Sequence, residues 1–291
     1  MARRAILGGV PVGEGLPVVV IGVLNVSPES FYPGSVHVDL DDLLASAERM
    51  VEGGAKLLDV GAMSTAPYLS TRIAEEEEAE RLGRAVERLV NKLGVPISAD
   101  TCRAVPAKAA LEAGAAIIND VSGLTADPAV AELVARAGAG LILMASPRGG
   151  RRLPGGPLGS ADNSPVSIAA ALLSESLELA RLAGIAEENI VVDPGIGFFR
   201  QSGQPWFEWD CEILARLGEL QGLGRPICIG VSRKSFIGAL LGQDDPGERL
   251  VGSLAAAAIA VVKGAHLIRT HDAAETSQVV RVAQAIAECQ A

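Results

Sequence analysis

Polar and charged residues follow almost every short apolar run of this sequence, at the positions where a β-strand would end. They are Asn25, Asp59, Asp100, Asn119, Asp120, Asp193, Ser232, Arg233, Lys234, Arg269, His271 and Asp272. Any one of them could cap a helix or lie in solvent at a rim. Because the carboxyl ends of parallel strands meet at one mouth or edge, the whole set indicates a binding site.

The residue types in this set favour a flat, polar ligand that carries an anionic group. Carboxylate and amide side chains match the hydrogen bonds of a heterocycle with amino and oxo groups. Lys234, Arg269 and His271 add positive charge beside the acids. Such a cluster is typical of a site that binds phosphate or pyrophosphate as a leaving group.

Eight β-branched runs must position these residues, and each run is followed by a segment with helical periodicity. The runs cover residues 18–25, 56–61, 96–101, 115–122, 140–145, 189–195, 226–232 and 266–272. Their spacing suits βα units, and their continuous apolar character indicates burial on both faces. We therefore predict an α/β protein with one domain, a (β/α)₈ TIM barrel over residues 18–291, preceded by an N-terminal hairpin or plug over residues 1–17. A doubly wound parallel sheet is the alternative fold.

Helices are predicted most clearly over residues 39–53 and 73–93, which carry Leu and Val on one face and Glu and Arg on the other. Residues 148–165 are rich in Gly and Pro and predict a long loop after the fifth strand. No low-complexity linker divides the chain, which supports a single domain.

The composition excludes several classes of protein. The chain has 291 residues, 49% of them hydrophobic, and a formal net charge of −10, which argues against disorder and generic nucleic-acid binding. The longest apolar runs are well short of the ~20 residues that a membrane-spanning helix needs. The N-terminus does not resemble a signal peptide, and the four cysteines are far apart, as in a protein with reduced thiols. We expect a cytoplasmic protein without a zinc site.

Sequence motifs of other enzyme classes are absent. There is no G-x-x-x-x-G-K-[ST] loop, no G-x-G-x-x-G turn opening a helix and no G-x-S-x-G elbow. Their absence argues against assigning a nucleotide kinase, a dinucleotide-dependent dehydrogenase or a serine hydrolase function.

Six collinear segments resemble the motifs of the dihydropteroate synthases, within the pterin-binding family. They cover residues 22–31, 97–101, 113–123, 192–198, 230–235 and 268–272, of which D-P-G-I-G-F and G-V-S-R-K-S are the most specific. The resemblance implies a (β/α)₈ barrel enzyme of folate biosynthesis. Such an enzyme is a transferase that condenses 6-hydroxymethyl-7,8-dihydropterin pyrophosphate with p-aminobenzoate and releases pyrophosphate.

The resemblance also implies a role for each matching position. It places Asp100, Asn119, Met144, Asp193, Phe198 and Lys234 around the pterin ring, Asn25, Arg269 and His271 at the pyrophosphate, Asn25 at Mg²⁺, and Thr65, Ser232 and Arg233 at the aminobenzoate. Asp100, Lys234, Arg269 and His271 are the expected catalytic residues. Ser232 is expected where a helix begins, so that the helix N-terminus could receive a carboxylate. The family also implies a homodimer, with the Ala-rich segments 254–262 and 279–287 as a possible apolar face.

Three positions depart from the pattern of the family. Pro33 stands where a second acid is expected, Ala66 replaces an arginine, and Ala145 replaces a histidine. These changes leave open a different amine, such as the ribosyl-phosphate aminobenzene used for methanopterin-type cofactors, or a loss of activity. A pterin-binding methyltransferase module and a Schiff-base aldolase that uses Lys234 are the other functions to be weighed. The aldolase would need a neutral amine, which Arg233 beside it disfavours.

Overall fold

The structure is a computed structural model that describes residues 3–27, 39–63, 73–147, 164–199 and 205–289. In these residues an antiparallel hairpin of β1 (Arg4–Leu7) and β2 (Val10–Gly13) precedes eight parallel strands. The parallel strands are β3 (Val19–Asn25), β4 (Leu57–Gly61), β5 (Ile97–Asp100), β6 (Ile117–Asp120), β7 (Gly140–Met144), β8 (Ile190–Asp193), β9 (Cys228–Gly230) and β10 (Leu267–Thr270). Each lies inside one of the eight runs expected from the sequence.

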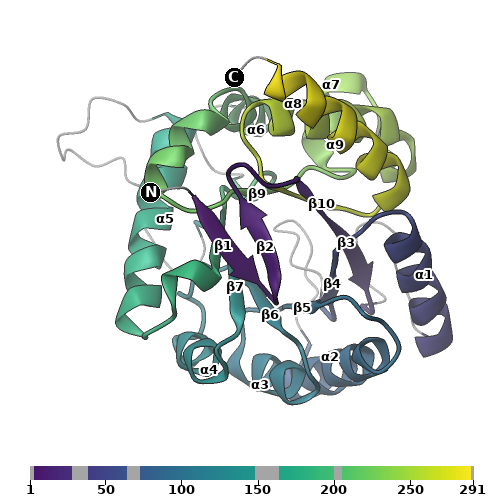
Figure 1. The fold of residues 1–291 in the computed structure, drawn as a ribbon, viewed down its shortest axis with the longest axis vertical. Helices are drawn as coiled ribbons and strands as arrows, with labels where there is room; N and C mark the ends of the chain where they lie inside the picture. Colours follow the sequence, from purple (N-terminus) through teal and green to yellow (C-terminus); the bar gives the residue numbers. More distant parts are fainter. Residues whose placement is uncertain (1–2, 28–38, 64–72, 148–163, 200–204, 290–291) are drawn as a thin grey trace.

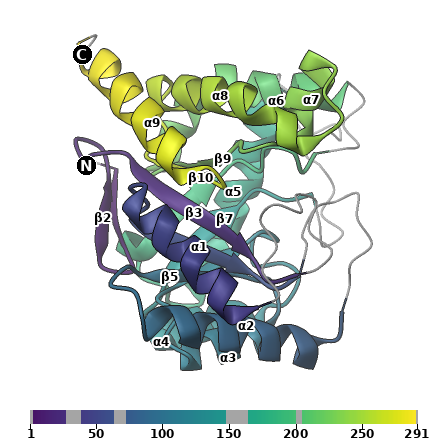
Figure 2. The same cartoon turned by 90° about the vertical axis from the view of Figure 1, so that its right-hand side faces the viewer.

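Helices surround the strands and make the outer layer (Figures 1 and 2). They are α1 (Leu40–Glu52), α2 (Glu75–Val90), α3 (Ala104–Glu112), α4 (Ala129–Ala137), α5 (Pro165–Leu182), α6 (Trp206–Ala215), α7 (Ser235–Leu241), α8 (Leu250–Val262) and α9 (Ala273–Glu288), with 3₁₀ turns η2 (Glu187–Asn189), η3 (Leu217–Leu223) and η4 (Pro246–Arg249). Most of the expected loop over 148–165 lies outside the described residues, and its last residue, Pro165, opens α5. None of the described helices combines the length and the apolar character that crossing a membrane requires.

The parallel strands close into a barrel. Their hydrogen-bonded order is β8-β7-β6-β5-β4-β3-β10-β9, and a parallel bridge between Val192 and Ile227 joins the two ends. The Val192 N–H also donates to the Pro226 carbonyl at 3.0 Å. A doubly wound sheet would leave two open edges, so the barrel prediction is confirmed and the alternative fold is wrong.

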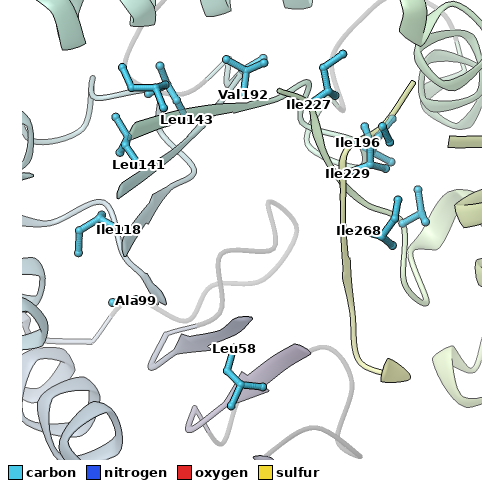
Figure 3. Close-up of a cluster of buried hydrophobic side chains, with 14 of the residues drawn as sticks. Leu58, Ala99, Ile118, Leu141, Leu143, Val192, Ile196, Ile227, Ile229 and Ile268 are labelled. Carbon is cyan, nitrogen blue, oxygen red and sulfur yellow. The ribbon is translucent and has the colours of Figure 1, made fainter. Parts of the chain in front are cut away.

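Strand periodicity sorts the side chains into two layers. One set faces the helices, and Figure 3 shows Leu58, Ile118 and Ile268 in this outer core. Their neighbours Leu57, Ile117 and Leu267 belong to a second apolar cluster inside the barrel. Because successive side chains of a strand alternate in direction, the residue two positions after each interior residue also faces the interior. After Leu57, Ile117 and Leu267 these next positions are Asp59, Asn119 and Arg269, which form a polar layer above the apolar floor.

The N-terminal hairpin covers the floor of the barrel. Leu7 and Val12 are fully buried in the interior apolar cluster, and the hairpin crosses the barrel in Figure 1. Gly8 sits at the turn with φ of +58°, and a Cβ there would lie 2.8 Å from the Cβ of Pro96. The turn therefore needs glycine both for its backbone conformation and for its close approach to the barrel. With this end covered, the polar layer lies toward the opposite mouth.

Candidate active site

The polar layer gathers side chains from the carboxyl ends of six strands. Interior alternation brings in Asn25 from β3, Asp59 from β4, Asp100 from β5, Asn119 from β6, Asp193 from β8 and Arg269 from β10. Asp120 follows Asn119 and therefore faces away from the interior, where its carboxylate accepts the Ser122 N–H at 2.6 Å. The expected convergence of distant strand ends is therefore present for these interior residues.

Arg269 stands at the centre of this layer between two carboxylates. Its Nε donates to Asp59 Oδ2 at 2.5 Å, and its Nη2 donates to Asp100 Oδ2 at 2.7 Å. Asn119 Nδ2 donates to the same Asp59 oxygen at 2.9 Å. One guanidinium thus holds two acids, and the amide of Asn119 is fixed with its carbonyl oxygen available to another donor.

Two buried carboxylates share one cation here, and this imbalance affects Asp100. Burial raises the pKa of Asp100 to about 7, helped by the neighbouring Asp59 charge and opposed by Arg269. Asp59 Oδ1 and Asp100 Oδ1 are both buried without a hydrogen-bond partner among the described residues. A buried acceptor without a partner is costly, so these two oxygens are suited to the N–H groups of a bound ring.

Asp193 and Lys234 form the other side of the layer. Asp193 Oδ1 accepts the Gly195 N–H at 2.7 Å, and burial raises the pKa of Asp193 while the charge of Lys234 lowers it. Lys234 Nζ donates to the Ile196 carbonyl and lies 4.8 Å from the centre of the Phe198 ring. A carbonyl acceptor, an aromatic face and a nearby carboxylate all favour the charged ammonium. This environment argues against a Schiff-base lysine.

Met144 ends β7 directly beside Asp193. The two residues are paired in the strand register, and Met144 is buried. Phe198 is only half-buried, whereas its neighbour Phe199 is fully buried. Met144 and Phe198 are therefore both close to the Asp193 and Lys234 side of the site.

His271 is bound to Ser232 by two hydrogen bonds across the mouth. The His271 backbone N–H donates to Ser232 Oγ at 3.2 Å, and Oγ lies 3.0 Å from Nδ1 of the same histidine. Since Oγ accepts from the backbone, its own proton is free to go to Nδ1, which leaves Nε2 as the protonated ring nitrogen. Burial and the charges of Arg269, Arg233 and Lys234 lower the pKa of His271 to about 3. The expected positive charge on His271 is therefore corrected: the ring is neutral and acts as a donor.

Arg233 is held by the segments that surround it. Its guanidinium donates to both carboxylate oxygens of Asp272, at 2.9 and 2.7 Å, and to the carbonyls of Pro246 and Gly247. Its backbone has φ of +55°, a left-handed conformation that is uncommon outside glycine. These hydrogen bonds tie the loop after β9 to the loop after β10 and to η4.

Helix α7 begins later than the sequence suggested. Its N-cap is Lys234 and its first residue is Ser235, so Ser232 lies outside the helix and is engaged with His271. The reason given for a carboxylate at Ser232, that a helix starts there, is therefore wrong. Arg233 lies between Ser232 and the helix with φ of +55°, outside the helical region, so the helix begins only after it.

Asn25 and Ala145 lie at the rim of the described site. A Cβ added to Gly61 would lie 3.4 Å from Asn25 Oδ1 and 3.9 Å from Asp100 Oδ2, so glycine keeps the space between these two side chains open. Ala145 is fully buried, and its N–H donates to the Asp193 carbonyl at 2.8 Å. Thr65, Pro33 and Ala66, whose roles or departures the sequence raised, lie outside the described residues.

Asp59 was recognised as a polar strand end but received no role. The structure places it at the centre, bound to both Arg269 and Asn119. The signal was available in the strand pattern, because Asp59 stands two residues after the interior residue Leu57.

Comparison with known proteins agrees with this geometry. The family model described as "Pterin binding enzyme" matches residues 21–271. The dihydropteroate synthase of Synechocystis sp. is 37% identical over 285 residues, which is 95% of this chain and 94% of that protein. Among solved structures, the Yersinia pestis dihydropteroate synthase with a sulfonamide drug has a TM-score of 0.85 and 33% identity, covering 98% of this chain and 99% of that one. The Xanthomonas albilineans dihydropteroate synthase with 4-aminobenzoic acid has a TM-score of 0.82 and 35% identity, covering 98% of each chain.

Proposed function

The chain belongs to the pterin binding enzymes and, within them, to the dihydropteroate synthases. We propose a role in the transfer reaction for each residue of its site. The substrates are 6-hydroxymethyl-7,8-dihydropterin pyrophosphate and p-aminobenzoate, and pyrophosphate is released. The observation that carries the assignment is the interior polar layer, in which Asp59 and Asp100 each present an oxygen beside Arg269 that has no partner among the described residues.

The pterin ring lies on the polar layer in this proposal. The free oxygens of Asp59 and Asp100 and the carbonyl oxygen of Asn119 accept or share the N–H groups of the ring. Asp193 accepts from the opposite edge, where Met144 and Phe198 pack against the faces of the ring. Lys234, held by a carbonyl and an aromatic face, donates to a ring nitrogen or oxo group.

The leaving group lies at the mouth, near Arg269 and His271. The bond between the methylene carbon and the bridging oxygen breaks, its electron pair goes to pyrophosphate, and the amine nitrogen forms the new C–N bond and loses a proton. Arg269 supplies positive charge and unused N–H donors, and the protonated Nε2 of neutral His271 supplies a further donor. Stabilising charge on the departing oxygen is the step in which such donors are most effective.

A magnesium ion fits the donor set at the rim, and we assign Asn25 to it. Within the described residues no group of three or more His, Cys, Asp or Glu side chains is placed to hold a metal. Mg²⁺ often takes only one or two protein oxygens and completes its shell with phosphate oxygens and water, so the Asn25 amide oxygen is sufficient on the protein side. When bound, the ion would neutralise charge on the pyrophosphate.

The aromatic amine is assigned as p-aminobenzoate, approaching over Ser232 and Thr65. Arg233 orders the loop that carries Ser232 instead of binding the carboxylate directly. The alternative amine with a bulkier para substituent depends on the changes at Pro33 and Ala66. Competition between p-aminobenzoate and the ribosyl-phosphate aminobenzene in one reaction measures the ratio of their kcat/KM values, and a ratio in favour of the latter would reject this assignment.

The direct test of the function is turnover. Purified protein with Mg²⁺, the pterin pyrophosphate and an aromatic amine should form a dihydropteroate product and release pyrophosphate in equal amounts. If neither amine is consumed while the pterin still binds, a pterin-binding module replaces the synthase. The matched control is Lys234→Met, which should keep the fold and lose most of the turnover.

We also propose that the protein forms a homodimer, with the face made by α8 and α9 as the interface between the two copies. Apolar side chains line a groove of about 710 Å³ on this face. Val251, Val282 and Ile286 are exposed by 77%, 62% and 53%. A contiguous apolar surface of this kind is unusual on a monomer, and a two-fold axis through it would cover both copies at once.

The oligomeric state tests this assignment by sedimentation. Val282→Asp places two charges in a two-fold interface and should give a monomer. Leu182→Asp, at a side chain exposed by 68% on α5, is the matched control and should leave the dimer intact. A monomeric wild-type protein, or a dimer insensitive to Val282→Asp, would reject the α8–α9 interface.

The cellular location is assigned to the cytoplasm. Cys102, Cys211, Cys228 and Cys289 are all free thiols in the described structure. Free thiols suit a reducing compartment.

A further inference from the structure

The ammonium of Lys234 is positioned by a short turn between β8 and α6. The Ile196 carbonyl accepts from Nζ, and the Phe198 ring lies 4.8 Å from it. Both groups belong to residues 195–198, so the place of the ammonium depends on the conformation of that turn.

The turn itself has an unusual backbone. Gly195 and Gly197 have φ of +78° and +83°, both in the left-handed region. A Cβ on Gly197 would lie 3.0 Å from Lys234 Cδ, so the lysine stem packs directly on the turn. Glycines leave a backbone free to adopt other conformations, and contacts from outside the turn are needed to select this one.

Helix α6 supplies those contacts from behind the turn. Asp210 Oδ1 accepts the Gly197 N–H at 2.7 Å, and Asp210 is only 1% exposed. The preceding residue, Trp209, stacks on Phe199 with ring centres 4.9 Å apart and an angle of 23°. The Ile196 side chain also anchors the turn, because it packs in the outer apolar core near Ile229 (Figure 3). Asp210 thus holds the turn at Gly197, and Trp209 holds the chain at Phe199, directly after the turn.

We propose that Asp210 is a positioning residue for Lys234. A carboxylate makes a strong hydrogen bond to a backbone N–H, and here the bond fixes the Ile196–Gly197 peptide, whose carbonyl oxygen accepts the hydrogen bond from Lys234. Asp210 itself touches no reacting atom. This inference rests on the proposed role of Lys234 at the pterin, and it adds α6 to the elements that determine pterin affinity.

Three variants separate positioning from general stability. Asp210→Asn keeps an acceptor for the Gly197 N–H, whereas Asp210→Ala removes it. Asp210→Leu, which is close to aspartate in shape and also has no acceptor, serves the same purpose if the alanine variant does not fold. The matched control is Asp127→Ala. The Asp127 carboxylate also accepts a backbone N–H from a distant segment, that of Ala104 at 2.8 Å, but it lies far from Lys234 along the chain.

The measurements are the Kd of the pterin pyrophosphate by calorimetry, kcat/KM for both substrates, and Tm. Asp210→Ala should weaken pterin binding by about tenfold or more, the scale of losing a hydrogen bond to a charged acceptor. Asp210→Asn should stay within about threefold of the wild type, because its amide oxygen can still accept. Asp127→Ala should lower Tm and leave the Kd unchanged.

A double-mutant cycle with Lys234→Met gives the decisive result. If Asp210 acts through Lys234, Asp210→Ala causes little further loss of pterin affinity in the Lys234→Met background. Equal losses in both backgrounds, or a wild-type Kd for Asp210→Ala, would overturn the positioning role while leaving the synthase intact. A wild-type protein that neither binds the pterin pyrophosphate nor turns it over would instead overturn the proposed function.

Discussion

Binding of the pterin ring should release a proton from Asp100. Burial beside Asp59 raises the pKa of this carboxyl to about 7 in the ligand-free site. Its Oδ1 has no partner among the described residues, so a ring N–H can donate to it. Hydrogen bonds from a ligand favour the charged carboxylate and lower its pKa, and the proton then leaves to solvent.

The size of this effect follows from the pKa. With a pKa of about 7, roughly half of the Asp100 carboxyls carry a proton at pH 7, and roughly nine-tenths do at pH 6. Binding at pH 7 should therefore release about 0.5 proton, and the release should fall to about 0.1 at pH 8. The apparent Kd should decrease about fivefold as the pH rises from 6 to 7 and about twofold more from 7 to 8, and then level off.

Calorimetry in buffers with different ionisation enthalpies measures this proton release. The ligand should be 6-hydroxymethyl-7,8-dihydropterin without its pyrophosphate, because phosphate groups titrate in the same pH range. Asp100→Asn is the control, and it should lose most of the buffer dependence. Binding enthalpies that do not depend on the buffer, or an equal release from Asp100→Asn, would refute this account of the site.

Three further predictions concern other parts of the barrel. Asp193→Asn should weaken pterin binding by about 1.5 to 3 kcal/mol, the scale of a charge-assisted hydrogen bond, and an unchanged Kd by calorimetry would contradict the role of Asp193. Arg103→Met should lower the free energy of unfolding by about 3 to 5 kcal/mol in urea titrations, because it leaves the buried Glu78 carboxylate, 2.9 Å from Arg103 Nη1, without its cation. The control Arg181→Met, at an exposed ion pair, should change little. His271 is neutral in the folded protein, with its pKa lowered to about 3 from 6.5, so its contribution to stability is full above pH 6.5 and is lost as the pH falls toward 3. His271→Gln should therefore lose less stability than the wild type between pH 7 and pH 4.5, and an identical loss in urea titrations would show that this histidine is not buried in its neutral form.

The local sequence determined the strands and the direction of their side chains. Each apolar run predicted a strand, and the period of two then put Asp100 and Asn119 inside the barrel with the interior residue Ile117. The same rule would have placed Asp59 there and turned Asp120 outward. These features depend only on neighbouring residues, which is why the sequence was sufficient for them.

Contacts between distant segments were decided by the closed barrel. Arg269 is hydrogen-bonded to Asp59 and Asp100, which are 210 and 169 residues away in the sequence. No local sequence pattern predicts which cation pairs with which acid over such separations. The same holds for Arg233, which turns to Asp272, and for Asp210, which supports the turn beneath Lys234. The pKa values of these groups depend on all the groups packed around them, so the raised pKa of Asp100 and the lowered pKa of His271 come from the tertiary structure alone.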